Sequence, residues 1–314
     1  MFRFLLVICT VISSYTSTFA CEDDLFFDEC DSLHIEDKTA VIMLTDTHEY
    51  SEMYQSIINL AEAQKRIYKN VVTIFNGDYF NKSSVNIQNT YVTKSNEYYW
   101  NKKGDAYNNG DINNPAPKFR ELLGELNNKG SEVVLNIGNH ELTNKQHLSK
   151  FIELLQNNVT VVSNLDFEKE FASNKINGSA KFGNVVVLGD TVEYAPAKKQ
   201  PEWKNIFDNK LDRLKQNIKN AKQTDCLIVA SHDSQSAVKH LATSIYNSIN
   251  TDNVLCITGH IHEESGSTKQ KYGNKNIQFI TPKSGAYSAY VAIIDKYGEL
   301  NNIYEKILKA EKPW

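Results

Sequence analysis

Residues 40–48 read AVIMLTDTH, an apolar run followed at once by an aspartate and a histidine. The run has the length of a buried strand. After it, residues 50–68 place apolar or aromatic side chains mostly on one helical face, and a second strand-like run follows at 71–75. This alternation of strand and helix patterns is typical of an α/β protein.

The same alternation continues along the chain. Pro117 and Gly130 predict the start and the stop of a helix. Further helices are predicted at 144–157, 211–221 and 234–249, and further strands at 132–137, 159–163, 185–188, 227–230, 254–258, 277–281, 290–294 and 302–307. The polar stretch 81–115 fits neither pattern and is too long for an ordinary connection, so we interpret it as a functional loop or an insertion.

The composition narrows the class of protein. Of 314 residues, 41% are hydrophobic and 23% are charged, which is the balance of a soluble globular protein. A disordered chain, a collagen-like fibre and a multi-pass membrane protein are therefore excluded. The net charge of −4 and the lack of a Lys/Arg cluster also argue against a nucleic-acid partner.

Residues 1–20 have the layout of an export signal. Arg3 precedes a short apolar run, and a small-x-small cleavage site ends at Ala20. Cleavage there would leave Cys21 first, but Thr18 stands where a bacterial lipobox has an aliphatic residue, which argues against a lipid anchor. We therefore expect a secreted protein, periplasmic or extracellular, without a stable membrane span.

The rest of the chain is predicted to form one domain. No internal repeat or linker divides it, so the expected organisation is a signal peptide at 1–20, an N-terminal segment at 21–38 and a domain at 39–310 that carries an insertion at 81–116. The insertion contains Tyr91, Tyr98, Tyr99, Trp100 and Tyr107. These rings either stack on a substrate base or pack the insertion onto the domain.

Four cysteines follow the signal peptide. They fall into two pairs, Cys21 with Cys30 and Cys226 with Cys256, and an oxidising compartment would permit two disulfides. The alternative for Cys226 and Cys256 is that both are buried strand residues, a common position for cysteine.

Polar side chains follow five of the apolar runs. The segments are 46–48 (DTH), 76–78 (NGD), 138–141 (GNHE), 231–233 (SHD) and 259–262 (GHIH). Five of the eight histidines stand in them, whereas His34, His147 and His240 are expected to be structural. In open α/β sheets the carboxyl ends of the strands form the edge where ligands bind.

These residue types indicate a metal centre. Oxygen and imidazole ligands without thiolates suit Zn, Mn, Fe or Co. Seven candidate ligands are too many for one tetrahedral ion but suit two divalent ions that share a carboxylate. Such a pair can hold a bridging hydroxide and clamp the oxygens of an in-line phosphoryl displacement.

The order D-x-H, GD, GNHE, SH, GHxH resembles the calcineurin-like metallophosphoesterase superfamily. Within it, the stretches GNHELTNKQHLSKFIELL, VTVVSNL and SAYVAIIDKYGEL are similar to the catalytic domain of the 5′-nucleotidase and 2′,3′-cyclic phosphodiesterase family. The resemblance covers about 39–307 and implies an α/β fold built as a two-sheet α/β/β/α sandwich in a single domain.

The resemblance also implies roles for individual residues. His140 would lie beside the phosphate, where it stabilises the transition state or protonates the leaving oxygen, and Glu141 would hydrogen-bond a loop or a group that supports the metal ligands. One metal would be held by Asp46, His48 and His262 and the other by Asn139, His232 and His260, with Asp78 bridging both.

The chain departs from the family pattern in three places. Glu49 stands where the family usually has glycine, and Thr143 stands where the nucleotidases have an aspartate that orients the catalytic histidine. We also expect the chain to lack the domain that grips the nucleoside in two-domain nucleotidases. Purple acid phosphatases place a metal-binding tyrosine three residues after the GD aspartate; here Tyr79 follows Asp78 directly, so we expect Tyr79 to be a packing residue.

The predicted function is that of an exported enzyme with two divalent ions, which hydrolyses a small phosphate ester by attack of a metal-bridging hydroxide. Nucleotides are candidate substrates, as for a 5′-nucleotidase. Two alternatives stay open. One is a phosphodiesterase acting on cyclic nucleotides or nucleotide sugars, and the other is a non-catalytic secreted scaffold that keeps the fold.

Overall fold

The computed structural model describes residues 35–48, 50–80, 113–143, 145–167, 175–193, 203, 205–262 and 264–310. The expected signal peptide, the first cysteine pair, Glu49, the side chain of Thr143 and the aromatic residues of the insertion lie outside the described residues. Within the described ranges, no helix is both long enough and apolar enough to cross a membrane.

The first sheet has seven strands in the order β13-β12-β1-β2-β3-β4-β5. Neighbouring strands from β1 to β5 run parallel, whereas β12 is antiparallel to both β1 and β13. The strands are β1 (Glu36–Thr45), β2 (Tyr68–Asn76), β3 (Ser131–Asn136), β4 (Val159–Val162), β5 (Ile176–Asn177), β12 (Ser288–Asp295) and β13 (Leu300–Ile307).

The second sheet has six strands in the order β10-β11-β9-β8-β7-β6. Its four central strands are parallel, and an antiparallel strand closes each edge. The strands are β6 (Ser179–Phe182), β7 (Val185–Thr191), β8 (Cys226–His232), β9 (Val254–Ile257), β10 (Gly266–Tyr272) and β11 (Lys275–Thr281).

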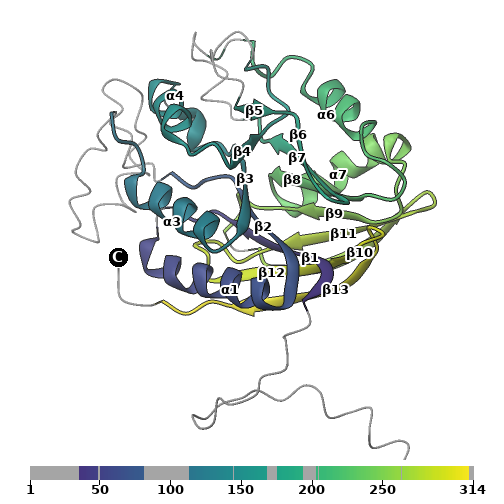
Figure 1. Cartoon of the computed structure of the whole chain (residues 1–314). Coiled ribbons are helices and arrows are strands. Elements are labelled where there is room, and N and C mark those ends of the chain that lie inside the picture. The colour runs from purple at the N-terminus through teal and green to yellow at the C-terminus, as the bar shows by residue number, and fades with distance from the viewer. Residues whose placement is uncertain are drawn as a thin grey trace, which may run out of the picture. The chain divides into compact units, whose positions relative to one another are not determined.

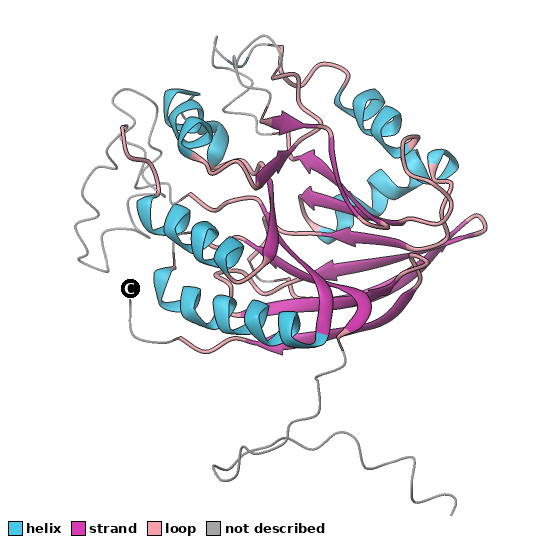
Figure 2. Cartoon of the chain, viewed as in Figure 1, coloured by secondary structure: helices cyan, strands magenta, loops and turns pink. Residues whose placement is uncertain are grey.

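Helices cover the outer face of each sheet (Figures 1 and 2). The first sheet packs against α1 (Tyr54–Ile67), α3 (Pro117–Asn128) and α4 (Lys145–Leu154). The second packs against α6 (Lys210–Ile218) and α7 (Gln235–Ile245). Three short 3₁₀ turns complete the described elements, η1 (Ser51–Met53), η4 (Glu141–Thr143) and η6 (Tyr246–Ser248).

The strand β1 shows why the two sheets stack. Alternate side chains of a strand point to opposite faces. Ala40, Ile42 and Leu44 lie in the core under the helices, whereas Val41 and Met43 lie in the core between the sheets. Both faces are apolar because both are buried, as is usual in parallel sheets. The predicted α/β/β/α sandwich is therefore confirmed.

Three strands were not predicted from the sequence. Strand β10 reads GSTKQKY and most of it is exposed, so it carries no apolar run. It forms at the sheet edge because its backbone pairs antiparallel with β11. Strands β5 and β6 are short, with two and four residues. The helix predicted at 50–68 begins with the 3₁₀ turn η1, and its last residue, Tyr68, already belongs to β2.

The second cysteine pair does not form a disulfide. Cys226 and Cys256 are both buried and free. Cys226 pairs with Val185 across its strand and Cys256 pairs with Val229, so the two cysteines are not opposite each other. They also face different layers, one the core between the sheets and the other the core under α6 and α7. The disulfide alternative is therefore wrong for this pair, and the buried-strand alternative is confirmed.

Candidate metal centre

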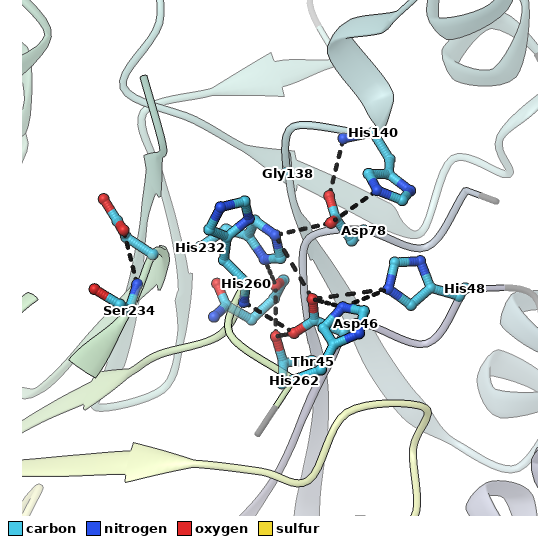
Figure 3. Close-up of polar contacts among 12 residues, drawn as sticks. Thr45, Asp46, His48, Asp78, Gly138, His140, His232, Ser234, His260 and His262 are labelled. Carbon is cyan, nitrogen blue, oxygen red and sulfur yellow. Dashed lines mark hydrogen bonds and ion pairs between the residues drawn. The ribbon is translucent and has the colours of Figure 1, made fainter. Parts of the chain in front are cut away.

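Strands of both sheets deliver polar side chains to one place (Figure 3). In the first sheet, β1 leads to Asp46, β2 to Asp78 and β3 to His140; in the second sheet, His232 ends β8 and His260 follows β9. The ends of β2 and β8 meet across the sandwich, where the Asn76 side-chain amide donates to the Ser231 carbonyl oxygen at 3.1 Å. The expected convergence of strand ends is thus present.

Asp46, His48 and His262 form a first group, which we call the outer cluster. The Nε2 atoms of the two imidazoles are 3.1 Å apart. The Oδ1 atom of Asp46 lies 3.4 Å from His262 Nε2 and 3.8 Å from His48 Nε2. Asp46 and His48 are buried, but the side chain of His262 is 55% exposed. One side of the outer cluster therefore faces solvent.

Asp78, His232 and His260 form a second group, the inner cluster. His232 Nε2 lies 3.1 Å from Asp78 Oδ2. The same nitrogen lies 3.8 Å from Asp46 Oδ1, so the two clusters adjoin. Asp78 and His232 are buried and His260 is half-buried. The inner cluster is therefore the better shielded of the two.

His140 also lies beside the Asp78 carboxylate. Its Nε2 lies 3.6 Å from Asp78 Oδ2, and its backbone N–H donates to Asp78 Oδ1 at 2.9 Å. Asn139, the preceding residue, is buried. All eight predicted site residues therefore lie at or just after the ends of strands. The ligand atoms of the seven Asp and His residues fall into groups within which all atoms are at most 4.8 Å apart.

Backbone carbonyls fix the ring tautomers. The Phe80 carbonyl oxygen faces Nδ1 of His140 at 2.9 Å and Nδ1 of His48 at 3.3 Å, and the Asn76 carbonyl oxygen faces Nδ1 of His232 at 2.6 Å. Because a carbonyl can only accept, each Nδ1 carries the proton and donates it. In the neutral form of each imidazole the lone pair is then left on Nε2, the atom that points to the carboxylates, as in metal-binding histidines.

Two buried oxygens suit a cation. Asp46 Oδ2 accepts from Thr45 Oγ1 at 2.7 Å and from the His260 backbone N–H at 3.1 Å. Asp46 Oδ1 and Asn139 Oδ1 are buried and have no hydrogen-bond partner among the described residues. A buried polar atom without a partner is costly, and a cation would satisfy it. Carboxylate, amide and imidazole donors together fit divalent transition-metal ions.

The charges of the site are balanced by protons when no cation is bound. Burial raises the pKa of Asp46, but the imidazoles of His232 and His262 outweigh it and lower that pKa. Burial lowers the pKa of His232, but the carboxylates of Asp78 and Asp46 outweigh it and raise that pKa to about 10. Burial lowers the pKa of His48. A cation that binds here must therefore displace protons from imidazoles.

The ligand loops have unusual backbone conformations. Asp46, His48, Asp78 and His260 have φ of 50°, 43°, 52° and 67°, the left-handed region that residues other than glycine rarely adopt. A Cβ at Gly138 would collide with the backbone nitrogen and Oδ1 of Asp78, so only glycine fits there. Local strain of this kind is typical of functional sites.

Glu141 joins the loop after β2 to the loop after β3 through hydrogen bonds. Its Oε2 accepts the backbone N–H groups of Asp78 at 2.9 Å and Gly138 at 2.8 Å, and its Oε1 accepts that of Phe80 at 2.9 Å. Burial, followed by the charge of Asp78, raises the pKa of this carboxyl to about 8. The expectation that Glu141 hydrogen-bonds a neighbouring loop is confirmed.

The remaining predictions concern residues around the site. Tyr79 is buried and stacks on Phe119 at 5.1 Å between ring centroids, so its predicted packing role is confirmed. No side-chain pattern marks Phe80 as a site residue, because it acts through its carbonyl oxygen. That carbonyl orients the ring of His140, a task for which the family pattern has an aspartate at the position of Thr143.

Solved structures share this fold. The chain superimposes on a 5′-nucleotidase precursor from Thermus thermophilus with a TM-score of 0.60 and 15% identity, over 86% of this chain and 55% of that one. For a protein assigned as a 5′-nucleotidase from Staphylococcus aureus, the TM-score is 0.53 and the identity 18%, over 87% of this chain and 53% of that one. For the calcineurin-like phosphoesterase YfkN from Bacillus subtilis, the TM-score is 0.51 and the identity 15%, over 88% of this chain and 91% of that one.

These identities show a common fold and no more. The chain spans about half the length of the two nucleotidase structures. No curated protein sequence matches it. The family model described as calcineurin-like phosphoesterase matches residues 39–264, which include every predicted ligand and His140. With its buried His/Asp clusters, the chain belongs to the calcineurin-like phosphoesterase family.

Proposed function

We propose that this protein is an exported phosphoesterase that works with two divalent ions and hydrolyses a small phosphate ester, with nucleotides as candidate substrates. The observation that carries the proposal is the position of His232 Nε2, 3.1 Å from the Asp78 carboxylate of the inner cluster and 3.8 Å from the Asp46 carboxylate of the outer cluster. The two clusters are thus close enough to act on one phosphate.

The outer cluster would hold one ion and the inner cluster, with Asn139, the other, and Asp78 would serve both. Such ions polarise phosphoryl oxygens and lower the pKa of water. His140, in its protonated form, would act on the leaving group. Its Nδ1 is fixed by the Phe80 carbonyl, so Nε2 is the atom that would donate a proton to the leaving oxygen.

The proposed nucleotide substrate and the proposed export of the protein are supported by different observations. The fold shared with 5′-nucleotidases favours a nucleotide, although the chain spans about half of those proteins. Residues 1–20 support export, and N-terminal sequencing of the protein recovered outside the cell tests it: a start at Cys21 is expected. Recovery of the intact sequence inside the cell alone would contradict export.

Asp78→Asn tests the enzyme. The purified protein is stripped of metal, supplied with Mn, Zn, Co or Mg, and offered AMP, 2′,3′-cyclic AMP and simple aryl mono- and diesters. We expect metal-dependent turnover that falls by about 10³-fold or more in Asp78→Asn, since several kcal/mol of charge stabilisation depend on the ions. Asp252→Asn makes the same chemical change at an exposed position and should leave turnover intact.

The ester that is turned over fastest assigns the class. Preference for AMP or an aryl monoester supports a monoesterase, and preference for the cyclic or aryl diester supports a phosphodiesterase. A folded wild-type protein that binds metal but hydrolyses nothing would overturn the proposal in favour of a scaffold.

A further inference from the structure

A row of aromatic rings leads outward from the metal centre. The ring centroids of His140 and His48 are 4.8 Å apart, and the ring of Tyr50 lies 6.2 Å beyond His48. Tyr287 comes next, 6.4 Å from Tyr50. The two histidines are buried, Tyr50 is half-buried and Tyr287 is 45% exposed. The row therefore runs from the proposed proton donor to the surface.

The loop that carries Tyr287 is attached to the metal centre through its backbone. The Gly285 N–H donates to the Asp46 carbonyl oxygen at 2.8 Å. Gly285 and Ala286 both have left-handed φ, 76° and 55°. A Cβ at Gly285 would press on the rings of Tyr287 and Tyr50, so glycine lets both rings come close to this loop. The position of Tyr287 is thus tied to that of a predicted metal ligand.

The surroundings of Tyr287 are also charged. Lys283 Nζ lies 6.0 Å from the centroid of its ring, within cation–π range. A cation at the rim of the site would attract an anionic phosphate ester. An exposed ring, a half-buried ring and a lysine therefore stand together on the side of the outer cluster that His48 borders.

We infer that Tyr50 and Tyr287 form a stacking subsite for the planar leaving group of a phosphate ester, an aryl or nucleoside group. The inference rests on the proposed function, because it assumes that the phosphate binds at the two clusters. His140 would protonate the leaving oxygen, so the leaving group lies on the side of the phosphate that His140 faces. Tyr50 and Tyr287 are the next rings along the row, and a planar group that extends outward from His140 and His48 would meet them.

The test compares a planar leaving group with a small flexible one. Full-length enzyme loaded with metal hydrolyses 4-nitrophenyl phosphate, AMP and glycerol 2-phosphate, and the ratio of kcat/KM between planar and flexible esters is measured. In Tyr287→Ala we expect this ratio to fall about tenfold, through KM, since stacking on an aromatic side chain has an effect of that size. Tyr287→Phe keeps the ring and should keep the ratio.

The chain offers a matched control. Tyr297 is 65% exposed, has Lys296 Nζ at 5.1 Å from its ring centroid, and follows β12, whereas Tyr287 precedes this strand. Tyr297→Ala therefore removes a similar exposed ring at the other end of the strand and should leave the ratio unchanged. Thermal unfolding of each variant shows whether it is folded.

The outcomes separate the subsite from the enzyme. Equal losses on planar and flexible esters in Tyr287→Ala, or no preference for planar esters in the wild type, would overturn the subsite while leaving the phosphoesterase intact. No turnover of any ester would overturn the proposed function. In that case saturation-transfer NMR with adenosine decides the subsite: a signal that Tyr287→Ala loses supports it, and absence of a signal in the wild type overturns it.

Discussion

The outer and inner clusters use the same side chains but differ in exposure. Each has one aspartate and two histidines. In the outer cluster the His262 side chain is 55% exposed, whereas in the inner cluster that of His232 is 0% exposed. The shell of residues around a metal site controls the access of solvent, and we expect an ion that solvent reaches to exchange more readily. The comparison therefore predicts a firmly held inner ion and an exchangeable outer ion.

The difference arises from where the histidines stand in the fold. His232 is the last residue of β8, pairs with Thr191 of β7, and has its Nδ1 held by the Asn76 carbonyl at 2.6 Å. His262 lies in the turn after β9, past the left-handed residue His260. One ligand is part of a sheet and the other part of a loop, so the first is better preorganised.

The largest expected effect comes from removing one histidine of each cluster. His232→Ala should lose the inner ion, and its turnover should fall by about 10³-fold. Its free energy of unfolding should also fall by about 3–5 kcal/mol, because the buried charge of Asp78 loses this partner. His262→Ala should lose mainly the outer ion, with a smaller loss of about 10–100-fold and little change in stability. Metal content after gel filtration and thermal unfolding measure both.

His240→Ala is the control for these variants, because it removes an exposed histidine from α7. Equal metal loss and equal destabilisation in His232→Ala and His262→Ala would show that the two clusters hold their ions alike, against the comparison.

A smaller effect is expected from Asn76, whose carbonyl oxygen lies 2.6 Å from His232 Nδ1 of the inner cluster and 3.0 Å from Oγ1 of Thr45, the neighbour of Asp46. Its side-chain amide donates to the carbonyl oxygens of Ser231 at 3.1 Å and Ile257 at 3.4 Å, both in the second sheet. Its Oδ1 accepts from the Asn136 side chain at 3.0 Å. These bonds hold the end of β2 against the end of β8, and hence the Asn76 carbonyl against His232.

Asn76→Ala should therefore weaken inner-site metal affinity by about 10–100-fold and weaken the outer site less, since Asn76 reaches Asp46 only through Thr45. Stability should fall by about 1–3 kcal/mol, because buried partners lose their hydrogen bonds. Metal titration against a chelator measures both affinities, with Asn301→Ala on exposed β13 as the control. A loss shared evenly by both sites would mean that Asn76 supports the whole fold rather than His232.

The ligand positions could be predicted because strand ends leave a local pattern. An apolar run followed by Asp, Asn or His marks both the buried strand and the residue that leaves the sheet edge, as at Asp46, Asp78 and His232. The stacking of the sheets follows from the same runs, since β1 is apolar on both faces. In these segments the local pattern and the tertiary structure agree.

Other features depend on atoms or contacts that the side-chain pattern does not encode. Phe80 orients two histidines through its carbonyl oxygen, which every residue possesses. Strand β10 forms through backbone pairing at an edge, with a polar sequence. The different exposure of His232 and His262 depends on which elements surround them, although both follow apolar strands in the sequence.

The prediction that sharpens the comparison most is the pH dependence of metal affinity, about tenfold for each pH unit. Without metal the carboxylates of Asp78 and Asp46 outweigh the effect of burial and raise the pKa of His232 to about 10. The carboxylate of Asp46, 3.4 Å from His262 Nε2, raises the pKa of His262. A ligand imidazole must be neutral, so below its pKa each ion displaces one proton, and affinity falls as the pH falls.

Inner-site affinity should therefore increase by about tenfold per pH unit from pH 6 to 9, since His232 stays protonated over this range in the metal-free protein. His262 is half-exposed and carries the smaller shift, so outer-site affinity should level off at a lower pH. Chelator competition at pH 6, 7, 8 and 9, with His262→Ala to isolate the inner site and His232→Ala to isolate the outer one, measures each slope. A flat inner-site profile would contradict the displaced proton, and parallel profiles would mean that burial does not distinguish the two clusters.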